Sequence, residues 1–235
     1  MVVGQFHGIL TGRSSPTWPT FGGGFFSAEH RHVEVVNASY YAWPLPRIEA
    51  IRNRGRSREL VRGMVRAGAL LQIECGCRAA FSLVSHSNGA VLALQVAREL
   101  IRRGTPIRAM VLIAPALRTK SASREIGEWL TRGMLEYALL VRPTRDWVIG
   151  GIARNWRTRL YAWPWGSLGY DGWDLGEMDP YRLGVEMPET IDLPGMGHND
   201  PVATENREWL YREIVSPALG LAPWGGMQPV PEDAE

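Results

Sequence analysis

Short apolar runs recur along the chain and are separated by longer stretches with helical periodicity. Residues 2–6, 79–84 and 109–114 are apolar and β-compatible, and they are too short for typical helices. Residues 32–36 alternate between polar and apolar positions. We therefore expect four strands in the first half of the chain.

Helical periodicity fills the intervals between these runs. Residues 60–71 carry apolar side chains on one helical face, and residues 91–103 do the same before Gly104. Two later short runs, 158–163 and 190–193, predict further strands. Strands that alternate with helices favour a mainly parallel sheet with helices on both faces, which is a three-layer α/β/α fold.

The segment 116–157 has two interpretations. Apolar residues between Ile126 and Leu140 have the spacing of one amphipathic helix. This helix either forms a small cap or lid over a site, or packs against a face of the sheet, because both arrangements need the same apolar stripe.

The length and composition predict one domain. The chain has 235 residues and is 45% hydrophobic, which allows a sizeable core. We assign this domain to residues 1–215, and we expect residues 216–235, which are rich in Pro and Gly, to form a partly ordered tail.

Charge and targeting signals argue against several classes of partner. The formal net charge is only +2, and we interpret the basic stretch 52–58 as a solvated helix start rather than a nucleic-acid site. No signal peptide or transmembrane run is evident, so we expect a cytoplasmic protein without an integral membrane segment. The oligomeric state stays open. Cys75 and Cys77 lack the further ligands of a zinc site and are too few for a disulfide framework, so we interpret them as two small residues just before a strand.

Residues 85–89, Ser-His-Ser-Asn-Gly, join a predicted strand to a predicted helix. A serine in such a sharp turn needs small neighbours two positions away on each side, and Ser85 and Gly89 meet this requirement. Ser87 would then stand at the edge of the sheet. The N–H of Asn88, at the helix start, would point toward a developing negative charge.

This turn resembles the nucleophile elbow of the α/β-hydrolase family, in which the usual pattern is Gly-x-Ser-x-Gly. Ser85 replaces the first glycine, which is a departure toward another small residue. The resemblance extends over nearly the whole chain, because His7-Gly8 precedes Ser87 and Gly197-His198 follows it in the family's order. It implies an α/β-hydrolase fold with a sheet of about six strands, as in compact lipases and esterases.

The resemblance also implies roles for individual residues. Ser87 corresponds to the nucleophile and His198 to the general base, and Asp171 is the expected triad acid, with Asp174 as the alternative. The backbone N–H groups of Ile9 and Asn88 would form the oxyanion hole, with Leu10 as the alternative to Ile9.

The expected activity is hydrolysis of carboxylic esters through an acyl-enzyme, without a metal or cofactor. Trp18, Phe21 and Trp165 are candidates for lining the pocket of a small-molecule ester with a short to medium acyl chain. A thioesterase, amidase or acyltransferase would use the same residues, and a non-catalytic binding protein is a further alternative.

Overall fold

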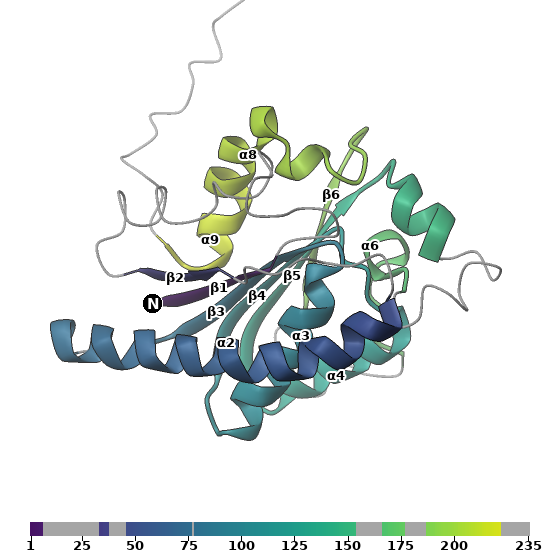
Figure 1. Ribbon diagram of the computed structural model, residues 1–235. Helices are drawn as coiled ribbons and strands as arrows, with labels where there is room; N and C mark the ends of the chain where they lie inside the picture. Colours follow the sequence, from purple (N-terminus) through teal and green to yellow (C-terminus); the bar gives the residue numbers. More distant parts are fainter. Residues whose placement is uncertain (7–32, 38–45, 77, 154–165, 177–186, 222–235) are drawn as a thin grey trace, which may run out of the picture.

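A parallel β-sheet forms the centre of the molecule (Figure 1). The computed structural model describes residues 1–6, 33–37, 46–76, 78–153, 166–176 and 187–221. Within these residues six strands form one sheet in the order β2-β1-β3-β4-β5-β6, and every neighbouring pair is parallel. Their bounds are β1 Val2–Phe6, β2 Glu34–Asn37, β3 Phe81–His86, β4 Ile107–Ile113, β5 Leu135–Pro143 and β6 Glu189–Leu193.

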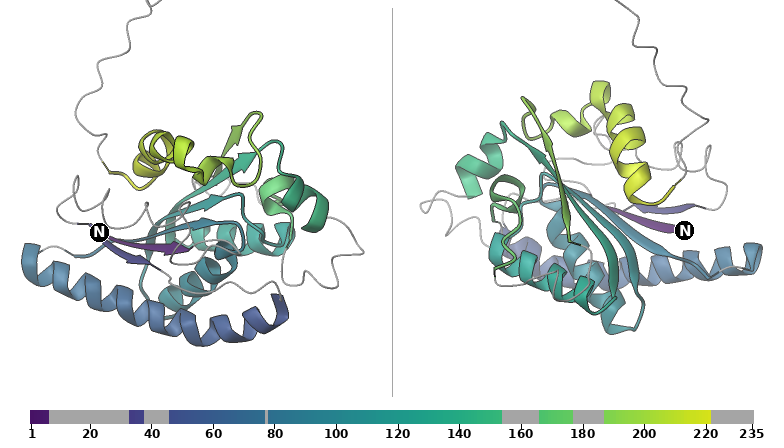
Figure 2. Two further views of the ribbon diagram at one scale, coloured as in Figure 1. Left: turned by 45° about the horizontal axis from the view of Figure 1, so that its top comes forward. Right: turned by 180° about the vertical axis from the view of Figure 1, so that it is seen from behind.

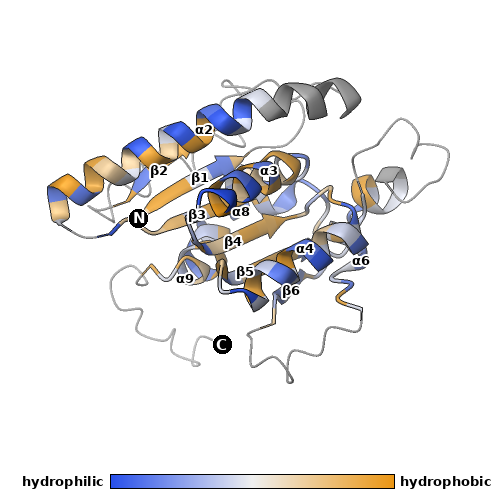
Figure 3. Cartoon of the chain, turned by 90° about the horizontal axis from the view of Figure 1, so that it is seen from below, coloured by the Kyte–Doolittle hydropathy of each residue, from blue (hydrophilic) through white to orange (hydrophobic). Residues whose placement is uncertain are grey.

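Successive residues of the central strands point to opposite faces of the sheet. On β4, Met110 and Leu112 pack into one apolar cluster, whereas Val111 and Ile113 pack into the other. Both faces are buried, so the strands read as nearly continuous apolar runs, which Figure 3 shows as orange ribbons. This burial explains why the short apolar runs of β1, β3 and β4 were recognisable from the sequence.

Helices cover the two faces in two groups, which the turned views in Figure 2 also show. Helices α2 (Pro46–Cys75), α3 (Gly89–Arg102) and α4 (Thr119–Thr131) lie on one face. The opposite face is covered by α8 (Thr204–Leu210), the π-helix η3 (Tyr211–Val215) and α9 (Ser216–Ala218). Three short elements complete the described chain: η1 (Val148–Ala153), α6 (Leu168–Asp171) and the 3-10 helix η2 (Asp200–Val202).

The strand order reverses direction at β1. The chain passes from β1 outward to β2, then returns to β3 on the other side of β1 and continues to β6. In doubly wound sheets ligands bind at the carboxyl ends of the strands, near such a reversal. The sheet order, the two helical layers and the sharp β3–α3 turn are those of the α/β-hydrolase fold, as expected.

The segment 116–157 differs from the sequence-based expectation of one long helix. The helix α4 ends at Thr131, Gly133 adopts a φ of +64°, and Leu135–Pro143 forms the strand β5 between β4 and β6. A buried strand and a buried helix segment can carry the same apolar run, and this similarity produced the error. The helix packs on the sheet face, so neither α4 nor β5 forms a lid.

The C-terminal boundary of the domain also needs correction. Ser216 and Leu219 are buried, and Leu219 belongs to the apolar cluster beneath α8 and η3. The packed domain therefore continues beyond residue 215, the expected boundary. Residues 222–235 lie outside the described part of the chain, as does the predicted strand at 158–163.

Two further findings concern membrane-spanning helices and the cysteines. No helix in the described segments is both long enough and apolar enough to cross a membrane. Cys75, the last residue of α2, is disulfide-bonded, although the sequence indicated only two small residues before a strand.

Candidate active site

Ser87 occupies a strained turn between β3 and α3. Its φ is +54°, a left-handed conformation that is rare for a residue with a side chain. Backbone hydrogen bonds with the end of β4 and the segment after it hold Ser87 there: Ser87 N–H donates to Ile113 O at 2.9 Å, and Ala116 N–H donates to Ser87 O at 3.1 Å. This is the conformation that a nucleophile elbow requires.

The small residues around Ser87 lie in the interior. Ser85 is fully buried within β3, between Phe6 of β1 and Leu112 of β4 in register, and Gly89 is buried at the first position of α3. Serine therefore fits the position where the usual pattern has glycine.

His198 lies on the loop after β6, the last strand. Gly195, with a φ of +76°, turns the chain out of the strand, and Gly197 N–H donates to Asp200 Oδ2 at 2.7 Å. Asp200 thus braces the loop that carries His198. His198 is 7% exposed.

The side chains of Ser87, His198 and Asp146 form one continuous line of hydrogen bonds. Ser87 Oγ lies 2.8 Å from His198 Nε2, and His198 Nδ1 lies 2.7 Å from Asp146 Oδ2. The Asp146 carboxylate only accepts, so Nδ1 carries the hydrogen and the Nε2 lone pair accepts the Ser87 hydroxyl hydrogen. This tautomer is the one in which imidazole can remove a proton from serine.

Asp146 is the acid of this line, and Asp171 is not. The Asp146 side chain is fully buried, and its other oxygen, Oδ1, accepts the Ile149 N–H at 2.8 Å. Asp171 is exposed at the end of α6, where its carboxylate accepts hydrogen bonds from Ser167 and Thr119. The expected contact of Asp171 with His198 is therefore wrong. Asp171 instead makes local hydrogen bonds that fix α6 to Ser167 and Thr119.

The alternative acid, Asp174, also lies away from His198. Its side chain is exposed, and its backbone N–H donates to Ser123 Oγ at 3.0 Å, which ties this loop to α4.

The missed residue follows directly from the missed strand. In this fold the acid comes from the loop after the penultimate strand, and the short apolar run 158–163 was the predicted penultimate strand. Since β5 ends at Pro143 and neighbours β6, Asp146 occupies the loop that the rule identifies. The apolar run 138–141, which follows Gly133 and ends before Arg142-Pro143, was the available signal.

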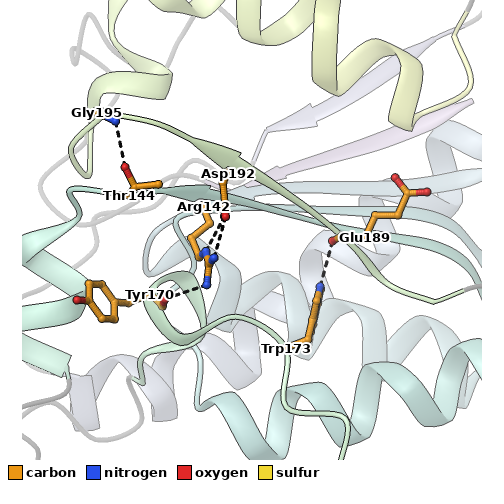
Figure 4. Close-up of polar contacts among 7 residues, drawn as sticks. All are labelled: Arg142, Thr144, Tyr170, Trp173, Glu189, Asp192 and Gly195. Atoms are coloured by element: carbon orange, nitrogen blue, oxygen red, sulfur yellow. Dashed lines mark hydrogen bonds and ion pairs between the residues drawn. The ribbon is translucent and has the colours of Figure 1, made fainter. Parts of the chain in front are cut away.

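The loops that carry Asp146 and His198 are joined by several hydrogen bonds. Thr144 N–H donates to Leu193 O at 3.1 Å, and Arg145 N–H donates to Met196 O at 2.9 Å. Gly195 N–H donates to Thr144 Oγ1 at 3.0 Å, as Figure 4 shows. These bonds keep the loop that carries Asp146 (the acid loop) and the loop that carries His198 (the base loop) at a fixed separation.

An ion pair between Arg142 of β5 and Asp192 of β6 also joins these two strands near the two loops. Arg142 Nε and a terminal nitrogen donate to the two oxygens of Asp192 at 2.7 and 2.8 Å, and Arg142 also donates to Tyr170 O at 3.2 Å (Figure 4). The hydrogen bond from Arg142 holds the pKa of Asp192 below its usual value, and the same bond raises the pKa of Arg142. The pair links β5 to β6 and both to α6.

The remaining predicted site residues divide into two groups. Asn88 directly follows Ser87, is the N-cap residue of α3 and is 3% exposed. Ile9, its alternative Leu10, and the pocket candidates Trp18, Phe21 and Trp165 lie outside the described residues.

No group of three or more metal-binding side chains comes together within the described segments.

Comparison with known proteins adds information on the fold. No family model and no curated protein matches the chain. An uncharacterized protein from Bacillus cereus superposes with a TM-score of 0.53 at 14% identity, over 92% of this chain and 58% of the other. This chain thus spans less than two thirds of that protein's length, and at such identity the likeness concerns the fold alone.

Two solved structures of named function are similar at lower scores. The RedJ thioesterase of the prodiginine pathway in Streptomyces coelicolor has a TM-score of 0.44 at 13% identity, over 91% of this chain and 89% of its own. An esterase from Pyrobaculum calidifontis has a TM-score of 0.47 at 16% identity, over 94% and 77% respectively.

Proposed function

We propose that this protein is a serine hydrolase that cleaves carboxylic esters through a Ser87-His198-Asp146 triad. The observation that carries the proposal is the unbroken hydrogen-bond line from Ser87 Oγ through both nitrogens of His198 to the buried Asp146. A serine on a strained turn, a base within hydrogen-bond reach and a carboxylate that orients the base are the three parts of this chemistry.

In the first half of the reaction, Ser87 Oγ attacks the carbonyl carbon of the ester. The Ser87 proton moves to His198 Nε2, and the resulting imidazolium is stabilised by the carboxylate of Asp146. The tetrahedral intermediate then expels the alcohol, which takes the proton from His198. The acyl group stays bound to Ser87 Oγ.

In the second half, water takes the place of the alcohol and hydrolyses the acyl-enzyme. His198 Nε2 removes a proton from water, the hydroxide attacks the acyl carbon, and Ser87 leaves with the proton that His198 returns. The protein is regenerated without a metal or a redox cofactor.

Negative charge on the carbonyl oxygen needs hydrogen-bond donors in each half. Asn88 N–H is the donor we propose from the described residues, because it follows Ser87 at the N-terminus of α3. Ile9 N–H, from the segment after β1, is the proposed second donor.

The proposed substrates are small esters with short to medium acyl chains, bound against Trp18, Phe21 and Trp165. A series of p-nitrophenyl esters of increasing acyl length tests this point. We expect the highest kcat/KM between acetate and octanoate, and a preference for charged acyl groups would contradict the assignment.

The cytoplasmic location remains part of the proposal, although disulfides such as that at Cys75 are more common in oxidising compartments.

Thioester hydrolysis, amide hydrolysis and acyl transfer use the same triad, because the pocket decides among them. Turnover of matched ester, thioester and amide substrates separates these activities.

A fluorophosphonate probe tests the central proposal. We expect covalent labelling of the wild-type protein and no labelling of Ser87→Ala. The matched control is Ser85→Ala, which changes another buried serine two residues away and should leave labelling intact. No labelling of the wild type, or equal labelling of Ser87→Ala, would favour a non-catalytic binding protein instead.

A further inference from the structure

His86 lies beside His198 in the interior of the protein. It is the last residue of β3 and directly precedes Ser87, and it is 2% exposed. The ring centroids of His86 and His198 are 5.1 Å apart, with an angle of 39° between the ring planes. This separation lies within the range of a direct contact between aromatic rings.

A buried hydrogen bond also joins His86 to the backbone of His198. His86 Nε2 lies 3.1 Å from His198 O. A carbonyl oxygen only accepts, so Nε2 must carry the hydrogen and donate. The strand that ends in the nucleophile is therefore bonded directly to the loop that carries the base.

The position of this bond makes it suited to set the distance between Ser87 and His198. The base loop is already tied to the acid loop by Thr144 and Arg145, but those bonds fix His198 relative to β5. The His86 bond instead fixes His198 relative to β3. Ser87 is the next residue after His86, so a shift of the base loop away from β3 would lengthen the 2.8 Å contact between Ser87 Oγ and His198 Nε2.

We propose that His86 is a positioning residue for the reaction, a role that rests on the ester-hydrolase function proposed above. It donates from Nε2 to the His198 carbonyl and packs its ring against the His198 imidazole. It thereby holds Nε2 of His198 in line with Ser87 Oγ while the proton moves between them. His86 itself does not exchange a proton with the substrate.

Three substitutions separate the hydrogen bond from the packing. Glutamine places an amide nitrogen the same number of bonds from Cα as histidine Nε2, so His86→Gln can keep the donor. Asparagine is one bond shorter, so His86→Asn keeps an amide donor that no longer reaches the His198 carbonyl oxygen. His86→Phe keeps a ring against His198 but has no donor.

The readouts are kcat and KM for p-nitrophenyl acetate and the rate of labelling by a fluorophosphonate. We expect kcat and the labelling rate of His86→Phe and His86→Asn to fall about 10- to 100-fold, because small misplacements of a catalytic group have effects of this size. KM should change less than about threefold, since the contacts of His86 that carry the proposal are with His198 and not with the substrate. His86→Gln should stay within about threefold of the wild type.

Thermal unfolding of each variant shows whether it is folded in the assay. Wild-type rates in folded His86→Phe, or equal losses in the Gln and Asn variants, would overturn the positioning role. If His86→Phe is unfolded, the comparison of the Gln and Asn variants decides alone. A wild-type protein that the probe does not label would instead reject the proposed function, so the two failures are distinguishable.

Discussion

Backbone strain collects beside the proposed nucleophile. Ser87 and Ala114 are the non-glycine residues of the described segments with positive φ, at 54° and 44°. Each follows the end of a central strand, and Ala116, two residues after Ala114, donates to the Ser87 carbonyl. Such conformations cost about 1–3 kcal/mol each and persist only where the surroundings enforce them. The second strained turn thus helps to hold the first.

Asp146 and Asp171 provide the most direct test at the level of single residues. We expect Asp146→Asn to lower kcat for p-nitrophenyl acetate by about 10³- to 10⁴-fold, because asparagine no longer favours the tautomer in which Nε2 can accept a proton. Asp171→Asn removes an exposed carboxylate on α6 and should keep kcat within about threefold of the wild type. Comparable losses in both variants would contradict the assignment of the acid.

At the level of elements, α6 packs tightly against the turn that supports Ser87. A Cβ atom on Gly169 would lie 2.8 Å from the backbone of both Ala114 and Pro115, so only glycine fits there without a shift. The backbone of Gly169 also donates to Pro115 O at 3.0 Å. The α6 region, where the triad acid was expected, therefore packs against the segment whose Ala116 N–H donates to the Ser87 carbonyl.

Gly169→Ala should therefore destabilise the protein by about 1–3 kcal/mol, the usual cost of overpacking. Gly151→Ala is the matched control, because a Cβ there meets nothing within 4 Å, and it should be neutral or stabilising by up to about 1 kcal/mol. Urea unfolding of both variants measures the difference. Equal stabilities would show that α6 moves away from the 114–115 turn without cost.

The Arg142–Asp192 pair predicts a pH dependence of the β5–β6 edge. The pKa of Asp192 is lowered in the folded state by the hydrogen bond from Arg142, so the pair stabilises the fold above the unfolded pKa of about 4. This contribution is lost as the pH falls through the lower folded value. Because the Asp192 side chain is 45% exposed, we expect only up to about 1 kcal/mol at pH 7.

Unfolding of Asp192→Asn and of the wild type at a series of pH values measures this contribution. The stability difference should be present at pH 7 and shrink below about pH 4, as long as the protein remains folded. A difference that is constant with pH would mean that the carboxylate charge is not responsible.

At the level of the whole molecule, one sheet separates two apolar cores. The larger cluster lies under α2, α3 and α4, and the smaller one lies under α8, η3 and α9. Neighbouring residues of β4 contribute to different cores, so the sheet couples them mechanically. The triad draws on both sides of this arrangement, because Ser87 begins the α3 turn and His198 precedes the helices on the opposite face.

Leu112 and Ile113 test this coupling, because they are adjacent, buried and directed to opposite cores. Substitution of either by alanine should cost about 2–5 kcal/mol, and each variant should unfold in one transition at a lower midpoint. Exposed Ile73→Ala is the control and should change stability by less than about 0.5 kcal/mol. Two separate calorimetric transitions in either core variant would contradict a single cooperative unit.

The sequence by itself determined the strands β1, β2, β3, β4 and β6, the sharp turn at Ser87 and the position of His198 after the last strand. These features are local: a buried strand is an apolar run, and a strand–Ser–helix turn needs small residues at fixed positions. Ser87 and His198 could therefore be proposed as site residues without knowledge of their contacts.

The tertiary structure alone decided which carboxylate meets His198. Asp146 and Asp171 both follow plausible loops, and nothing local distinguishes them. Asp146 reaches His198 because β5 lies in the sheet between β4 and β6, so that the carboxyl ends of β5 and β6 are neighbours. The contact between His86 and His198 is likewise a product of the fold, since 112 residues of chain separate the two side chains. Strand order is set by packing over the entire sheet, and no short sequence window contains it.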